Sequence, residues 1–395
     1  MNMRKSFEKR LFANTDRGSA LILAGFVLFG LIWYGPSAVE VLGAETLYTR
    51  TDQVSNGHVW TPNVDSSLVN PWGIVSPRQG PWWVVNEGRG RATLYTGEGI
   101  SFPGLSPLVV TIPVNPGGVY DYSTPTGIVF NGTDSFELAS GAPSRFIFVT
   151  RDGTIAGWNE NVNRYYAVLV VDNSPAAVYT GAAIARFHED NALYVANFRQ
   201  GRVDVFGPDF SPLLLDAGAF TDPLIPDGFA PYNIQNIDGE IYVTFAEPLS
   251  AGRDAASGEG MGYIDVFDTE GKLIMRFEHG PWMDAPWGIA LAPPIGFGEY
   301  SSTLLAGNNG SGRIAAFDVE SGAFTGYLTD TQGTTLTIAG LHALGFGNNG
   351  LAGPSTTLFF SAGFHDNKKQ SIFGTITAVT LPLTTTPPLE SGMNY

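Results

Sequence analysis

Two sets of residues with ligand-binding chemistry recur along the chain at a spacing of roughly 52–55 residues, which is typical of internal repeats. The first set is rich in aromatic rings and consists of Trp72, Thr126, Thr180, Tyr232, Trp287 and His342. The second set follows an apolar run in each repeat and consists of Asn86, Thr150, Asn197, Phe245, Asn308 and Gly363. Aromatic rings beside amide and charged groups are typical of sites for polar ligands with a flat or sugar-like face.

We therefore predict a ligand-binding site formed by Trp72, Asn86, Glu87, Arg151, Asn197, Tyr232, Trp287, Asn308 and His342. The competing interpretation is structural, with the rings packed between neighbouring repeats and the Asn side chains capping turns. Glu87 and Arg151 would form an ion pair, and a buried ion pair is tolerated only if both groups are hydrogen-bonded.

No residue pattern identifies a catalytic centre, so the catalytic residues stay unknown and enzyme activity stays an open question. The five histidines are scattered without the spacing of a zinc site, no Gly-x-Ser-x-Gly motif occurs, and the chain has no Cys. We predict no cofactor. One alternative stays open, because oxygens of Glu87, Asn197 and Asn308 could hold a divalent cation such as calcium that polarises a carbonyl group.

The elements that carry these residues are short strands. Each repeat has three apolar runs rich in β-branched and aromatic residues, and most repeats have a fourth. Arg202–Phe206 and Tyr263–Phe267 show the alternation of strands, and Asp268–Gly271 and Asp318–Gly322 have the residues of tight turns. Six such repeats predict an all-β fold, a six-bladed β-propeller with four-stranded blades. A parallel β-helix fits less well, because its coils are shorter and lack three turns per repeat.

The two ends of the repeat region are predicted to pair. Leu47–Val54 is a strand-like run before the first repeat, whereas the sixth repeat lacks its outer strand. Leu47–Val54 would therefore lie beside Phe373–Leu381 and close the ring, which removes an exposed sheet edge. The propeller would span residues 47–383, between a linker at 36–46 and a polar tail at 384–395.

Propeller geometry places both residue sets on one face. Inner strands begin and second strands end at the same mouth of the central channel, so the two sets would converge there. The two longest turn loops, Ala246–Gly262 and Gly363–Phe373, would overhang this mouth, and loops on a rigid scaffold often carry function.

The N-terminal segment indicates a destination outside the cytoplasm. Residues 1–17 are basic, and residues 18–35 are apolar and uncharged with Trp33 and Tyr34 near their end. This pattern predicts an N-terminal apolar helix, either a signal peptide or, as we favour, an uncleaved membrane anchor with residues 1–17 in the cytoplasm. The propeller would then be extracytoplasmic, in the periplasm or at the cell surface. The net charge of −16 argues against nucleic acid as a partner.

The repeats resemble an uncharacterised bacterial family of exported six-bladed propellers, known as conserved hypothetical proteins. The segments that carry the resemblance are Asn70–Ile74, Arg151–Asn159, Asn197–Gly201, Tyr263–Phe267, Ala285–Ala290 and Ile372–Thr377. The resemblance implies the fold, export and often a surface-sorting tail, but no known activity. This chain departs from the family because its last residues lack a sorting helix and because His342 stands where Trp is usual.

More distantly, the repeats are similar to NHL-repeat and gluconolactonase-like propellers. That similarity implies a metal-dependent lactonase as an alternative function, but Asn70–Trp72 stands where the lactonase-type Glu would begin the first inner strand. We therefore favour an exported or membrane-tethered scaffold that binds a ligand or a protein. Its partner would be an unknown protein or a small polar, sugar-like ligand, and the membrane if the N-terminal helix is uncleaved.

Overall fold

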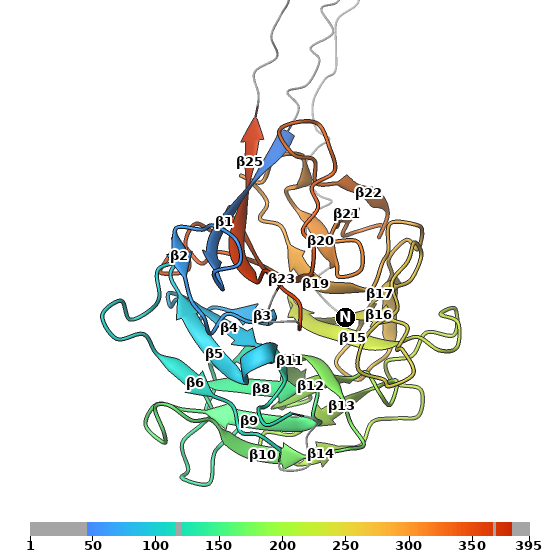
Figure 1. The fold of residues 1–395 in the computed structure, drawn as a ribbon. Helices are drawn as coiled ribbons and strands as arrows, with labels where there is room; N and C mark the ends of the chain where they lie inside the picture. Colours follow the sequence, from blue (N-terminus) through green and yellow to red (C-terminus); the bar gives the residue numbers. More distant parts are fainter. Residues whose placement is uncertain (1–45, 116–119, 366–368, 381–395) are drawn as a thin grey trace, which may run out of the picture. The chain divides into compact units, whose positions relative to one another are not determined.

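Six sheets surround a central axis in the computed structural model, which describes residues 46–115, 120–365 and 369–380 (Figure 1). Their strands pair antiparallel, except for one short parallel pair at the outer edge of the last sheet. The inner strands of consecutive blades contact one another, and the inner strand of the last blade contacts that of the first, so the ring is closed. The predicted all-β, six-bladed propeller with four-stranded blades is therefore confirmed.

Each blade runs from the axis outward in chain order. Blade 1 contains β3 (Pro71–Val75), β4 (Trp82–Asn86), β5 (Arg91–Tyr95) and β6 (Val109–Thr111). Blade 2 contains β7 (Pro125–Phe130), β8 (Phe146–Thr150), β9 (Thr154–Trp158) and β10 (Val168–Asp172). Blade 3 contains β11 (Tyr179–Phe187), β12 (Asp190–Asn197), β13 (Arg202–Phe206) and β14 (Pro212–Leu213).

The second half of the ring repeats this order. Blade 4 contains β15 (Ala230–Ile237), β16 (Glu240–Ala246), β17 (Tyr263–Phe267) and β18 (Leu273–Arg276). Blade 5 contains β19 (Pro286–Leu291), β20 (Thr303–Asn308), β21 (Ile314–Asp318) and β22 (Phe324–Tyr327). Blade 6 contains β23 (Leu341–Phe346), β24 (Leu358–Ala362) and β25 (Ile372–Thr380), followed outward by β1 (Thr46–Ser55) and β2 (Asn63–Val64).

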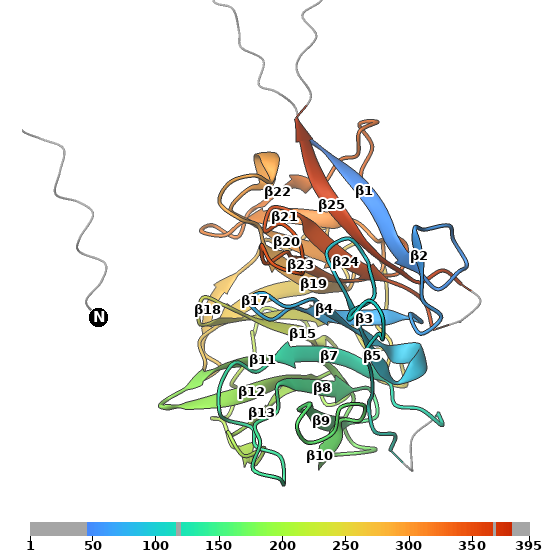
Figure 2. The same cartoon turned by 90° about the vertical axis from the view of Figure 1, so that its left-hand side faces the viewer.

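The last blade is completed by the first strand of the described chain. β1 pairs antiparallel with β25, with Leu47 opposite Val379 and Val54 opposite Phe373. Figure 2 shows the two strands side by side along the edge of the molecule. The predicted closure by Leu47–Val54 is confirmed, and the ring ends are joined by a ladder that runs from Thr46 to Ser55 with one register shift between Asp52 and Val54.

The inner strand of every blade has an irregularity near its start. In blade 2, Pro125 pairs with Thr150 and Gly127 with Val149, so Thr126 is an extra residue, and the register shifts at the matching place in the other five blades. A β-bulge re-aims its extra side chain. The first residue set from the sequence occupies these bulges. Gly73 beside the bulge of blade 1 is required, because a Cβ there would lie 2.6 Å from the carbonyl oxygen of Thr126.

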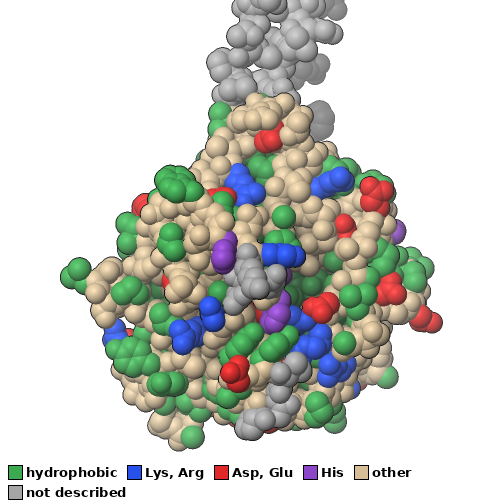
Figure 3. Space-filling model, viewed as in Figure 1, with side chains coloured by type: hydrophobic (Ala, Val, Ile, Leu, Met, Phe, Trp, Pro, Cys, Tyr) green, Lys and Arg blue, Asp and Glu red, His purple; other side chains and the backbone are tan. Residues whose placement is uncertain are grey.

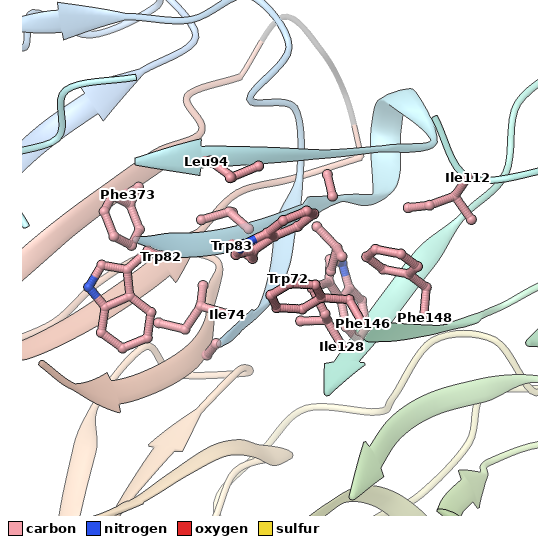
Figure 4. Close-up of a cluster of buried hydrophobic side chains, with 14 of the residues drawn as sticks. Trp72, Ile74, Trp82, Trp83, Leu94, Ile112, Ile128, Phe146, Phe148 and Phe373 are labelled. Carbon is pink, nitrogen blue, oxygen red and sulfur yellow. The ribbon is translucent and has the colours of Figure 1, made fainter. Parts of the chain in front are cut away.

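Aromatic side chains fill the spaces between blades. Between blades 1 and 2, the rings of Trp83 and Phe146 stack with centroids 3.9 Å apart (Figure 4). The Trp158 ring lies 4.9 Å from that of Trp83. On the other side of blade 1, Trp82 lies 5.0 Å from Phe359 of blade 6. Full burial of a large apolar side chain contributes about 1.5–3 kcal/mol, so these contacts hold the ring together.

The predicted N-terminal helix at 18–35 and the tail at 384–395 lie outside the described residues. So does the predicted linker at 36–46 except for Thr46, which is the first residue of β1. Within the described part of the chain the helical elements are two single turns, η1 (Glu87–Arg89) and η2 (Gly298–Tyr300). No helix of the described residues is long and apolar enough to cross a membrane.

Candidate functional site

Ionisable side chains gather at the mouth where the inner strands begin. We name this group the charged cluster, and its members are Glu87, Arg151, Asp152, Arg253, Asp254 and His365. They come from η1 of blade 1, the turn after β8 of blade 2, the loop between β16 and β17 of blade 4, and the chain after β24 of blade 6. Figure 3 shows basic, acidic and histidine side chains around the centre of this face.

Glu87 is the centre of the charged cluster and has no exposed surface. Asn70 Nδ2 donates to Oε2 of Glu87 at 2.9 Å, and His365 Nδ1 donates to the same oxygen at 2.7 Å. Arg151 Nη1 donates to Oε1 at 3.1 Å, which forms the ion pair that the sequence predicts. Donors from three blades thus satisfy a carboxylate that burial would otherwise strongly destabilise.

Arg151 joins Glu87 to the β16–β17 loop. Its Nη2 donates to Asp254, and its guanidinium lies 5.7 Å from the centroid of the Trp72 ring, in a cation–π contact. Arg253 of the same loop donates from Nη1 to the carbonyl oxygen of Arg151 at 2.8 Å. The loop of blade 4 therefore reaches across to blade 2, as predicted for the longest loop on this face.

These contacts set the protonation of the charged cluster. Burial by itself raises the pKa of Glu87, but the hydrogen bond from His365 and the charge of Arg151 together bring it below its ordinary value. The same hydrogen bond raises the pKa of His365 above that of an ordinary histidine, against the effect of burial. Glu87 is therefore ionised, and His365 keeps its proton to a higher pH than a free imidazole would.

An aromatic edge borders the charged cluster. The rings of Tyr120 and Tyr122 stack with centroids 5.2 Å apart, and the His365 ring lies 4.8 Å from Tyr120. The side chains of His365 and Asp254 are 39% and 67% exposed, so both are open to a ligand. Ring faces beside an exposed carboxylate and imidazole suit a sugar-like molecule.

Four of the predicted site residues form a layer beneath the charged cluster. The Trp72 ring lies 4.2 Å from His342, 5.6 Å from Trp287 and 6.3 Å from Tyr232, and all four side chains are buried. Burial lowers the pKa of His342 to about 3, so this imidazole is neutral at pH 7. The structure thus brings these four residues together at the axis, but as a packed aromatic layer and not as an open rim.

Several buried polar atoms next to this layer lack partners. Trp72 Nε1, His342 Nδ1, Arg151 Nε and Asn70 Oδ1 have no hydrogen-bond partner among the described residues. Buried polar groups in folded proteins are nearly always paired with protein or ordered water. Water or a ligand is therefore expected between the charged cluster and the aromatic layer.

The three predicted amide residues bond locally instead. Asn86 Nδ2 donates to Thr93 Oγ1 at 2.9 Å, and Asn197 Nδ2 donates to Asp204 Oδ2 at 2.7 Å. Asn308 Nδ2 donates to the carbonyl oxygen of Trp282 at 3.0 Å, and its Oδ1 accepts from the Asp284 amide at 2.8 Å. None of these described hydrogen bonds reaches Glu87, so the structure does not join the amides to the charged cluster.

The arrangement of Glu87, Asn197 and Asn308 does not fit a shared cation. Three donors already occupy the Glu87 carboxylate, and the two amides bond within or beside their own blades. Among the described residues no group of three or more His, Asp or Glu side chains is arranged to hold a metal ion.

Six residues of the mouth are missing from the predicted site: Tyr120, Tyr122, Asp152, Arg253, Asp254 and His365. The available signal for the last three was loop length, because they lie in the two longest loops predicted over this face. Tyr120 and Tyr122 lie in the connection between β6 and β7, at no repeated position, so no periodic signal marks them.

The fold and the mouth define a six-bladed β-propeller with a polar site at one end of its channel. No family profile matches the chain. The chain is 32% identical over 302 residues to an uncharacterised protein of Acanthamoeba polyphaga mimivirus, a match that covers 74% of this chain and 72% of the viral protein. A second uncharacterised protein of the same virus is 32% identical over 303 residues, covering 74% of this chain and 76% of that protein.

The chain therefore belongs to the family of these uncharacterised mimivirus proteins. A third mimivirus protein is 36% identical over 231 residues, and the chain spans only 42% of its length. These relatives are viral, so the bacterial and exported character that the resemblance implies stays a prediction.

Two solved structures have a similar overall fold. A Bacteroides thetaiotaomicron protein of unknown function has a TM-score of 0.51 at 9% identity, covering 85% of this chain and 77% of that chain. The soluble aldose sugar dehydrogenase of Escherichia coli, in its apo form, has a TM-score of 0.50 at 11% identity, covering 85% of this chain and all of that chain. At such low identity the likeness shows the fold alone.

Proposed function

We propose that this protein binds a small, sugar-like polar ligand at the mouth of its central channel, over the charged cluster. The observation that supports this most is Glu87, a fully buried carboxylate held by donors from three blades. Ordering loops from blades 1, 2, 4 and 6 around one buried charge costs stability, and this is characteristic of a site kept for binding.

The chemistry of the mouth supports a sugar-like class of ligand. Tyr120 and Tyr122 offer ring faces for the C–H face of a sugar, and Asp254 accepts hydrogen bonds from hydroxyl groups. His365 donates to Glu87 through Nδ1, which leaves Nε2 as the ring nitrogen without a hydrogen-bond partner among the described residues, and we assign the ligand contact to it. The unpaired Arg151 Nε and Asn70 Oδ1 lie beneath and could be reached through bridging water.

A thermal-shift titration tests this proposal. Neutral and acidic monosaccharides and short oligosaccharides are the probes, because a ligand that binds only the folded state raises the melting temperature with its concentration. Tyr120→Ala should weaken the affinity by about three- to tenfold through loss of ring stacking. Tyr166→Ala is the matched control, since Tyr166 is an exposed tyrosine that the contacts of the charged cluster do not include. Absence of any saturable shift, or an equal effect of the two variants, would overturn the proposal.

The alternative is a lactonase-like hydrolase with a central divalent cation, which the sequence leaves open. The two functions differ in their need for metal. If the protein is a binding module, purified protein carries no stoichiometric divalent ion, and ligand-dependent stabilisation survives EDTA. Elemental analysis that finds one calcium per chain, with stabilisation lost in EDTA and restored by calcium, would favour the hydrolase.

The proposed location is outside the cytoplasm. It is motivated by the basic residues 1–17 before the apolar residues 18–35, which tether the propeller if they are not cleaved. A polar mouth facing the periplasm or the medium would meet small soluble ligands directly.

A further inference from the structure

Blade 3 has an incomplete outer strand. β14 pairs with β13 only through Val205 opposite Leu213 and Phe206 opposite Pro212. Among the described residues no strand lies beside the rest of the edge of β13, from Arg202 to Asp204, whereas its other side is fully paired with β12. An open strand edge presents backbone donors and acceptors to any extended chain that fits beside it.

The matching position is filled in the other blades. Blade 4 has the closest sequence, Gly262–Phe267 against Gly201–Phe206, so Ile264 corresponds to Val203. The carbonyl oxygen of Ile264 accepts from the Phe277 amide at 2.9 Å, and in blade 5 that of Ile314 accepts from the Leu328 amide at 3.1 Å. Among the described residues, no chain after β14 makes this bond to Val203.

A large cleft takes the place of the missing strand. Its volume is about 850 Å³, and its lining includes Arg202–Asp204, Leu213–Asp216, and Ser174, Ala176 and Ala177. Leu214 is 97% exposed beside it. Within the described structure the exposed Asp216 carboxylate has no ion-pair or hydrogen-bond partner.

We propose that this cleft binds an extended, basic peptide segment of a partner protein, which adds to blade 3 as its outer strand. Edge addition of this kind combines backbone hydrogen bonds with pockets for alternate side chains. Here the backbone of Val203 supplies the hydrogen-bonding groups, and Leu213–Leu215 supply an apolar lining for side chains. Charge favours a basic segment, because among the described lining residues Arg202 is paired with Asp204 whereas the Asp216 carboxylate has no partner, and the chain carries a net charge of −16. The outer strand of blade 4 is itself basic, with Lys272 just before it and Arg276 within it. Arg276 lies opposite Asp265, the residue of blade 4 that corresponds to Asp204 of blade 3.

The test uses a fluorescein-labelled peptide with the sequence of Gly271–Phe277, the natural outer strand of the matching blade. Fluorescence anisotropy with the full-length protein should show saturable binding. The same peptide with proline at the position of Phe277, whose amide donates to Ile264 in blade 4, should bind at least about tenfold more weakly, because proline removes this backbone donor and disfavours pairing.

Two protein variants locate the binding. Ala176→Trp fills the cleft from an exposed position, and Asp216→Lys reverses its free charge, so each should weaken binding by about threefold or more. Glu320→Lys, an equal charge change on an exposed turn of blade 5, should leave it unchanged. Both cleft residues are exposed, so folding is not at risk, and circular dichroism verifies this.

Three results would overturn the proposal. They are no saturable binding of the peptide, equal binding to wild-type and Ala176→Trp protein, and equal weakening by Glu320→Lys and Asp216→Lys. Light scattering measures whether the protein forms a dimer in solution. A dimer that Ala176→Trp dissociates would assign the open edge to a second copy of this chain instead of a partner peptide.

Discussion

At the scale of single residues, two buried acids behave in opposite ways. Glu87 meets three hydrogen-bond donors, and its pKa lies below the ordinary value. Asp265 on β17 is 2% exposed, and its Oδ2 has no partner among the described residues. Burial and the neighbouring Asp222 raise the pKa of Asp265 to about 7. The difference is one of partners, because burial alone raises the pKa of both carboxyl groups.

The Asp265 carboxyl should make stability fall as pH rises. Its folded-state pKa of about 7 lies above the unfolded value of about 3.9, so the folded state binds an extra proton between the two values. Stability from this group is present below about pH 4 and is lost towards pH 7. Asp265→Asn, which keeps a donor for Asp222, should therefore gain stability relative to wild type as pH rises from about 5 to 8, measured by urea unfolding. Asp227→Asn, at an exposed position, is the control, and parallel curves for Asp265→Asn and wild type would contradict the prediction.

His365 should give a second pH dependence in a higher window. Its folded-state pKa is raised by the hydrogen bond to Glu87, so its contribution is complete below about pH 6.5 and is lost as pH rises through the raised value. His365→Gln keeps a donor without the charge. The wild-type free energy of unfolding should therefore fall relative to this variant above about pH 6.5. A constant difference between the two proteins from neutral to alkaline pH would show that the Glu87–His365 pair is not charged.

At the scale of elements, sequence patterns identify the strands that recur in every blade and miss the irregularities of single strands. The alternation in Arg202–Phe206 and Tyr263–Phe267 predicts β13 and β17 with their bounds. The sequence gives no fourth run for blade 3, and the structure has only the two-residue β14 there. The inner-strand bulges are invisible in the alternation, because a single extra residue breaks period two without a composition signal. For this reason the sequence predicts that the aromatic residues lie at the axis, but it does not predict that their side chains are buried there.

The β1 strand offers the sharpest test of ring closure. Tyr48 on β1 is 1% exposed, its ring lies 5.0 Å from Phe297 and 5.9 Å from Tyr300, and its hydroxyl donates to the Phe297 carbonyl at 3.0 Å. Tyr48→Ala should lower the free energy of unfolding by about 3–5 kcal/mol, as for other large buried aromatic residues. Tyr48→Phe should cost about 1–3 kcal/mol, because it leaves one buried carbonyl unpaired. Denaturant unfolding measures both, and a Tyr48→Ala loss below that of Tyr48→Phe would mean that β1 is dispensable for closure.

At the scale of the whole molecule, the fold could be predicted and the site only in part. Six repeats and the pairing of Leu47–Val54 follow from periodicity, which is a local property of sequence. The pair of Glu87 and Arg151 could be predicted because both residues follow strand ends in adjacent blades. His365 and Asp254 reach the same place through loops whose paths depend on tertiary contacts, and no spacing rule encodes those contacts.

The location of the whole molecule is testable with a reporter. We expect alkaline phosphatase fused after Tyr395, which requires export for activity, to be active, because the basic residues 1–17 before the apolar residues 18–35 predict that residues 1–17 stay in the cytoplasm and that the following chain crosses the membrane. Deletion of residues 18–35 should abolish this activity while leaving expression intact. A green fluorescent protein fusion that fluoresces in the cytoplasm of cells whose phosphatase fusion is inactive would contradict export.

The pairing of β1 with β25 also determines how the propeller bears mechanical load. Thr46 and Thr380 are register partners at the same end of an antiparallel pair, so tension applied through these two residues pulls the strands apart sideways. The hydrogen bonds between β1 and β25 would then break one after another, starting from that end. They would not have to break together, as they do when two strands are pulled along their length in opposite directions. A tether at one end of this chain and a cargo at the other would open the ring at low force, whereas a load applied through the mouth would leave the closure untouched.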